Sequence, residues 1–159
     1  MITGTAAPFT EKRDLGSRTF KNILVAVTKR CGMRAIEAAA RLATPGFSRV
    51  MLLHLQERIT YPRKCAVVNL ETYAEAVDFA AKMQAELREL GIEGQVKVGR
   101  ELSGWEACQI LIAAYDLGAD LLIAGNRRKS RLYALLTGST TLDIVRMSAI
   151  TVCLVPQRQ

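Results

Sequence analysis

The stretch ADLLIAGNRRKSRLYALLTGST, from Ala119 to Thr140, carries the pattern on which the fold prediction depends. It begins with a continuous apolar run, which is typical of a strand buried on both faces of a parallel sheet. Gly125 ends this run, basic residues follow, and Gly138-Ser139-Thr140 then opens a helical pattern. Free backbone amides and the helix dipole favour an anion at such a helix start. The stretch therefore predicts a strand, a loop and a helix, with an anion site between the strand and the helix.

Similar strands and helices alternate on both sides of this stretch. Three more short apolar runs are expected to be strands, at residues 20–28, 48–56 and 149–156, and a more polar segment at 93–100 is expected to be an edge strand. Helical periodicity covers residues 32–46, 70–91, 103–118 and 139–148. Strands separated by helices pair in parallel through right-handed crossovers. We therefore predict an α/β protein with a single doubly wound five-stranded parallel sheet of the flavodoxin-like type, in strand order 3-2-1-4-5.

Two segments give more detailed expectations. Residues 57–69 have no clear period and contain Pro62, so we expect a long surface loop that is suited to a lid or a partner contact. In the helix at 70–91, helical spacing predicts a buried stripe. Its expected members are Tyr73, Val77, Ala80, Met83 or Gln84, Leu87 and Leu90.

Composition and charge narrow the class of protein. A chain of 159 residues, half of them apolar, is long enough for one domain with its own core. We expect residues 1–19 to form a flexible N-terminal arm and residues 20–159 to form the domain. The net charge of +7 favours anionic partners, but a basic excess alone is weak evidence, so nucleic acid is not an expected partner; binding driven by this charge would show steep salt dependence.

Cysteine usage and hydropathy indicate the compartment. The four cysteines show no CxxC spacing, and no apolar run approaches the length of a membrane span. These features predict a reduced, cytoplasmic protein that does not enter a membrane. His54 lies within an apolar strand without nearby partners for a metal site or a catalytic triad, so it is expected to be a packed, hydrogen-bonded histidine.

In a doubly wound sheet, ligands bind beyond the carboxyl ends of the strands where the strand order reverses. With the predicted order, this point lies between the first and fourth strands, at residues 27–29 and 125–127. The basic residues that follow Gly125 would make the local field positive. A simpler interpretation is that Ser139 or Thr140 only caps the helix and that the basic residues form a solvated loop.

From Lys21 to Pro156 the chain resembles the universal stress protein family. The resemblance rests on the segments NILVAV, LLHL, GADLLIAG and ITVCLVP. It also rests on the spacing of the glycines that follow the fourth expected strand, at residues 119–125. The nucleotide-binding branch has a glycine after that strand, a second glycine three residues later, then nine residues and Gly-Ser or Gly-Thr. Gly125 and Gly138-Ser139 match this pattern, whereas Arg128 occupies the second glycine position and Thr28 replaces an aspartate.

The resemblance implies an adenine nucleotide site with ATP or a related nucleotide as its ligand. The residues that would contact adenine and ribose are Ala26, Val27, Thr28, Leu55 and Ala124. Those that would surround the phosphates are Gly125, Arg127, Arg128, Gly138, Ser139, Thr140 and Thr141. Arg128 would either bind phosphate through its guanidinium or fill the pocket with its own side chain. No catalytic residue and no metal ligand is assigned.

The expected function is a binding and regulatory module of the stress response with a modified ATP-type pocket. Two alternatives remain: an interaction protein of the same fold that binds no nucleotide, and a slow ATP hydrolase. The final strand is apolar and lies at a sheet edge, where a free strand promotes association. The resemblance implies that this strand pairs across a two-fold axis, so we expect a homodimer through Ile150 to Val155 that also binds a regulatory protein.

Overall fold

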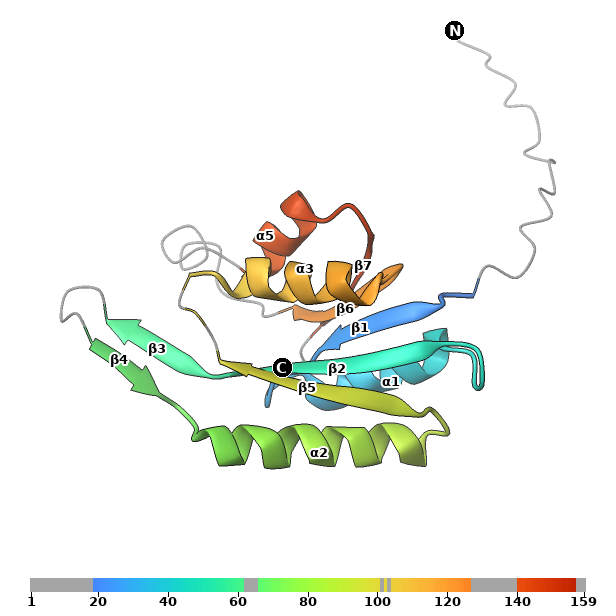
Figure 1. Ribbon diagram of the computed structural model, residues 1–159, viewed down its shortest axis with the longest axis horizontal. Coiled ribbons are helices and arrows are strands. Elements are labelled where there is room, and N and C mark those ends of the chain that lie inside the picture. Colours follow the sequence, from blue (N-terminus) through green and yellow to red (C-terminus); the bar gives the residue numbers. More distant parts are fainter. Residues whose placement is uncertain (1–18, 62–65, 101, 103, 127–139, 157–159) are drawn as a thin grey trace, which may run out of the picture.

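The fold is a five-stranded parallel sheet with helices on both faces (Figure 1). The computed structural model describes residues 19–61, 66–100, 102, 104–126 and 140–156. Residues 1–18 of the expected N-terminal arm lie outside the described residues. The sheet contains β1 (Asn22–Ala26), β2 (Arg49–Gln56), β5 (Gly94–Arg100), β6 (Leu121–Asn126) and β7 (Thr151–Pro156). Their order is β5-β2-β1-β6-β7, which confirms the predicted order 3-2-1-4-5.

The helices are α1 (Gly32–Leu42), α2 (Tyr73–Glu89), α3 (Glu106–Leu117) and α5 (Thr140–Met147). In Figure 1, α1 and α2 cover one face of the sheet and α3 and α5 cover the other. Side chains of β1 alternate between two cores. Ile23 and Val25 pack with α1 and α2, whereas Leu24 and Ala26 pack with α3 and α5. Because both faces are covered, β1 is apolar and buried from Ile23 to Ala26.

Helix α2 begins with a complete capping box. Thr72 accepts a hydrogen bond from the Glu75 amide at 3.2 Å, and the Glu75 carboxylate accepts one from the Thr72 amide at 2.6 Å. The Thr72 amide and hydroxyl together hold the pKa of Glu75 below its ordinary value. The predicted buried stripe of this helix was partly wrong, because the helix buries Ala76, Ala80, Met83 and Leu87.

Three members of the predicted stripe, Tyr73, Val77 and Leu90, are exposed instead. The buried face thus starts at Ala76 and is one position away from the predicted face in the first two turns. Alanine fits there because α2 packs closely against the sheet, with Ala76 and Ala80 fully buried. The larger Tyr73 and Val77 side chains point outward instead, and the Arg100 guanidinium lies 5.8 Å from the centroid of the Tyr73 ring.

Residues 57–69 were predicted to form a long loop, and this prediction was wrong. They contain β3 (Arg58–Tyr61) and β4 (Ala66–Asn69), which pair in antiparallel register as a separate two-stranded sheet. The strands are rich in β-branched and aromatic residues, but each is only four residues long and their alternation is too short to recognise. Figure 1 shows this hairpin extending beyond the main sheet and the start of α2.

Candidate functional site

The carboxyl ends of β1 and β6 lie side by side at the point where the strand order reverses. Ala26 is opposite both Leu53 of β2 and Ala124 of β6 in the register. On one side of this point the sheet extends from β1 to β2 and β5, and on the other side it extends from β6 to β7. The structure therefore places the predicted switch point where the sequence indicated.

Two small side chains from these strands line the same face of the sheet. Ala26 and Ala124 both belong to the core on the α3 and α5 side, and Leu55 packs against that core. Val27 belongs to the opposite core, on the α1 and α2 side. Of the residues expected to contact adenine, Ala26, Leu55 and Ala124 thus share a face of the sheet, whereas the side chain of Val27 lies on the other face.

The backbone of Val27 already has partners within the chain. Its amide donates to the Leu53 carbonyl at 2.9 Å, and its carbonyl lies 2.9 Å from Nδ1 of His54. Thr28 is exposed, and its carbonyl accepts hydrogen bonds from the amides of Cys31 and Gly32 at 3.2 and 2.8 Å. The Thr28 hydroxyl also lies 3.3 Å from the Cys31 amide. Thr28 therefore stabilises the turn into α1.

Gly125 does not act as the turn that the sequence indicated. It lies inside β6, opposite Val155 of β7, and the strand continues to Asn126. Its structural role is to leave room for Cys31 at the start of α1. A Cβ atom at position 125 would lie 2.5 Å from Cβ and 2.8 Å from Sγ of Cys31. A side chain at this position therefore requires the β6 to α1 packing to move.

The start of α5 is held against the end of β6. The Thr141 hydroxyl donates to the Gly125 carbonyl at 3.3 Å, and Thr140 is the first residue of the helix. Both threonines are half-buried. Arg127, Arg128, Gly138 and Ser139, the other residues predicted to surround phosphate, lie outside the described residues. The described part of the predicted phosphate site is thus the end of β6 and the first turn of α5.

A buried polar cluster next to the end of β1 was not anticipated from the sequence. Glu71, which precedes α2, contacts Nε2 of His54 at 2.7 Å and Nζ of Lys29 at 2.8 Å. The Glu57 amide donates to the same carboxylate at 2.9 Å, and the Gln56 side-chain amide donates to the Glu71 carbonyl at 2.8 Å. The His54 and Glu71 side chains are 0% and 1% exposed, whereas that of Lys29 is 43% exposed.

The protonation of the cluster follows from its donors and acceptors. The Val27 carbonyl can only accept, so Nδ1 of His54 carries a hydrogen and donates it to that carbonyl. Burial raises the pKa of Glu71, but the Lys29 ammonium, the Glu57 amide and the His54 ring outweigh it and lower that pKa overall. The same carboxylate raises the pKa of Lys29. Glu71 is therefore ionised near neutral pH.

The predicted hydrogen-bonded role of His54 is confirmed, and its ring also packs on Phe79 with centroids 4.7 Å apart. The sequence did not indicate its partner, because no local pattern distinguishes Glu71 from other acidic residues that precede a helix. The available signal was the burial of the only histidine, which requires a polar partner somewhere in the fold.

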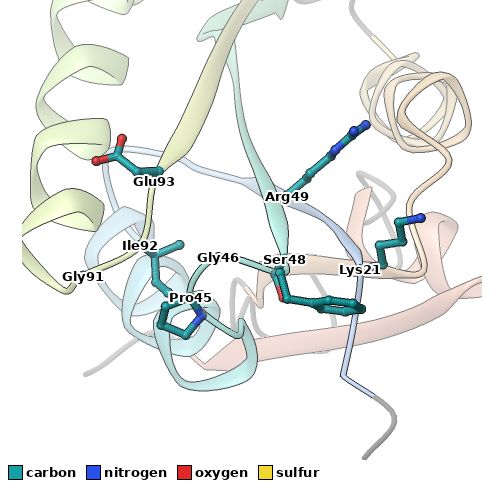
Figure 2. Close-up of a pocket in the computed structure, with 9 residues that line it drawn as sticks. Lys21, Pro45, Gly46, Ser48, Arg49, Gly91, Ile92 and Glu93 are labelled. Carbon is teal, nitrogen blue, oxygen red and sulfur yellow. The ribbon is translucent and has the colours of Figure 1, made fainter.

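A surface hollow lies at the opposite end of the sheet from the switch point. Its volume is about 490 Å³, and it is formed by the segments at residues 45–49 and 91–93 together with Lys21. Figure 2 shows the charged side chains of Lys21, Arg49 and Glu93 pointing in different directions. These groups do not converge on one point, so the hollow lacks the arrangement that orients a polar ligand.

Among the described residues, no group of three or more His, Cys, Asp or Glu side chains is arranged to hold a metal ion. In the same part of the chain, no helix is both long and apolar enough to span a membrane.

Comparison with known proteins gives a family and a set of similar folds. The family model described as "Universal stress protein family" matches residues 19–156. Among curated proteins, none matches the sequence. Many solved structures match the fold, and three of these illustrate the range.

The hypothetical protein MJ0577 has a TM-score of 0.66 and 20% identity, over 89% of this chain and 99% of its own. A universal stress protein in complex with cAMP has a TM-score of 0.64 and 19% identity, over 88% and 99% of the two chains. The universal stress protein from Archaeoglobus fulgidus in complex with dAMP has a TM-score of 0.55 and 20% identity, over 86% and 98%. At these identities the likeness establishes the fold.

Proposed function

The chain belongs to the universal stress protein family, and on that basis we propose that it is a binding and regulatory module of the stress response whose ligand is an adenine nucleotide of the ATP type. The site would be the carboxyl ends of β1 and β6. Two of the structurally similar universal stress proteins are in complex with adenine nucleotides, one with cAMP and one with dAMP, which supports this class of ligand. We also infer that the protein acts in the cytoplasm.

The observation that carries the proposal is the contact between α5 and β6 at the switch point. The Thr141 hydroxyl fixes the first turn of α5 at the Gly125 carbonyl. The positive end of the helix dipole is then directed to the place where the strand order reverses. A phosphate group at this position would be bound by Thr140, Thr141 and the preceding Gly138-Ser139, with Arg127 and Arg128 nearby in the sequence.

The base would lie on the α3 and α5 side of the sheet. Ala26 and Ala124 have the smallest side chains that a buried strand position commonly carries, and Leu55 lies partly buried on the same face. Apolar surface of this kind suits an adenine ring. Val27 and Thr28 would contribute through the backbone at the end of β1, beyond the hydrogen bonds that they already make.

Mapping by NMR tests this placement. The amide resonances of uniformly labelled, nucleotide-free protein are compared before and after addition of AMP, with CMP as the matched control. We expect shifts at Ala26, Ala124 and Thr141 with AMP and much smaller shifts with CMP. Equal responses to both nucleotides, or shifts confined to residues 45–49 of the hollow, would overturn the proposed site.

One feature favours the alternative of an interaction protein that binds no nucleotide. Lys29 lies in the turn that follows β1, yet its ammonium is engaged by Glu71 at 2.8 Å. In that alternative the polar groups at the end of β1 stabilise the fold and leave signalling to the surface. The NMR experiment separates the two functions, since the alternative predicts no response to AMP.

We further propose that the protein is a homodimer through β7. This strand is at the edge of the sheet, and it pairs only with β6 among the described residues. Leu154 remains 37% exposed on it. A free apolar edge strand pairs readily with a second copy, which would place Ile150 to Val155 at a two-fold axis.

A further inference from the structure

The hairpin of β3 and β4 carries a surface that the nucleotide site does not use. Each strand pairs only with the other among the described residues, so both outer edges are free. A two-stranded ribbon is marginally stable in water unless something covers it. Its exposed apolar residues are large for such a small element, with Tyr61 at 45%, Val67 at 55% and Val68 at 47% exposure.

The root of the hairpin is firmly attached to the main sheet. The Leu70 amide donates to the Glu57 carbonyl at 2.9 Å, which closes the base of the ribbon. Glu57 and Gln56 are in turn bonded to Glu71 in the buried cluster. The ribbon therefore extends from a fixed base, as Figure 1 shows, and its orientation is set before any partner binds.

The register defines which backbone groups point outward from β4. Hydrogen-bonded and non-hydrogen-bonded pairs alternate along an antiparallel ladder. Because Glu57 and Leu70 form a hydrogen-bonded pair, the next pair, Arg58 with Asn69, is not hydrogen-bonded, and the same holds for the pair that contains Val67. The amide and carbonyl groups of Val67 and Asn69 therefore face the free edge of β4.

The two faces of the ribbon differ in chemistry. Paired residues share a face, so Tyr61, Ala66 and Val68 form an apolar face, while Arg58 and Asn69 lie on the other face with Val67. Nε of Arg58 is buried without a hydrogen-bond partner among the described residues. From residue 58 to residue 70 the sequence has three basic residues and no acid. The ribbon is thus apolar on one face and positively charged overall.

We propose that the free edge of β4 binds an extended peptide segment of a partner protein, with alternating apolar and acidic residues, as a third strand. Such a segment would pair its backbone with Val67 and Asn69. Its apolar side chains would cover Tyr61 and Val68, and its carboxylates would lie on the face of Arg58. Strand addition accounts for the free edge, the two different faces and the excess of positive charge together.

A synthetic peptide of alternating valine and glutamate, about eight residues long with blocked ends, tests the proposal. Its affinity is measured by fluorescence anisotropy against the full chain, next to a peptide of alternating valine and lysine. We expect the glutamate peptide to bind and to weaken several-fold in 0.5 M salt, because exposed charges are screened. The lysine peptide should bind at least about tenfold more weakly.

Val67→Pro removes an outward amide without removing a bond of the β3 to β4 ladder, and Val67→Thr is its matched control. We expect Val67→Pro to weaken binding by about tenfold or more, and Val67→Thr to change it less than about twofold. A glutamate peptide with every amide N-methylated tests the same pairing without any change in the protein, and it should not bind.

Three outcomes would overturn the proposal. The first is absence of binding by the glutamate peptide, or equal binding of the lysine peptide. The second is full binding of the N-methylated peptide, which would exclude backbone pairing. The third is a dimer in sedimentation velocity that Val67→Pro dissociates, because a second copy of the chain would then occupy the edge.

Discussion

Replacing Glu71 by glutamine should destabilise the protein more than any other single removal of a carboxylate from the described residues. The variant keeps the size of the side chain but loses its charge, which faces Lys29 at 2.8 Å and His54 at 2.7 Å. Hydrogen bonds to a charged group contribute about 1.5–3 kcal/mol each, and breaking a buried ion pair costs about 3–5 kcal/mol. Lys29 is half-exposed, so its contact contributes less. We expect a loss of about 3 kcal/mol.

Urea unfolding at pH 7 measures this loss as a lower midpoint with an unchanged slope. Glu89→Gln, at the exposed end of α2, is the matched control and should change the free energy of unfolding by less than about 0.5 kcal/mol. Equal losses in the two variants would refute the reasoning, since the buried cluster would then contribute no more than a surface carboxylate.

The same variant has a defined pH dependence. The pKa of Glu71 is lowered in the folded protein from its ordinary value of 4.5. Its contribution to stability is therefore fully present above that value and is lost as the pH falls through the lower folded pKa. The difference between parent and Glu71→Gln should accordingly be full at pH 7 and should shrink in acid below pH 4.5. A difference that grows in acid would contradict the lowered pKa.

Three other changes test the packing, the helix start and the dimer. Gly125→Ala should lower the free energy of unfolding by about 1–3 kcal/mol, because its Cβ would lie 2.5 Å from Cβ of Cys31; Cys31→Gly should restore much of that loss in the double variant, measured by urea unfolding. Thr72→Ala removes the side-chain cap of α2 and should cost about 1 kcal/mol in the same assay, with no change at all arguing against the cap. Leu154→Lys places a charge on the exposed edge of β7 and should convert the proposed dimer to a monomer in light scattering, and a dimeric mass for this variant would contradict an interface at β7.

The core of the fold could be predicted from the sequence because β1, β2 and β6 are buried on both faces. Their unbroken apolar runs, separated by helical patterns, leave few arrangements other than a parallel doubly wound sheet. The end of β1 and the end of β6 then had to meet. Ala26 and Ala124 are neighbours for this reason, and the sequence was sufficient to place them together.

The features that were predicted wrongly or missed depend mostly on contacts between residues that are distant in the sequence. The sequence suggested that Gly125 allows a sharp backbone turn, whereas in the structure its lack of a side chain leaves room for Cys31. The pairing of His54 with Glu71 joins residues that are 17 positions apart on different elements. No local period or motif encodes such a contact. The hairpin was missed because strands of four residues are too short for their alternation to stand out.

Calorimetric titration of nucleotide-free protein with ATP and with AMP, in parallel with Arg128→Gly, tests the central claim most directly. The account predicts micromolar binding by the parent protein, with Arg128 acting as a phosphate ligand, so that Arg128→Gly binds more weakly. Absence of binding by the parent together with binding by Arg128→Gly would contradict it, because the arginine would then close the pocket and the function would lie on the surface of the protein.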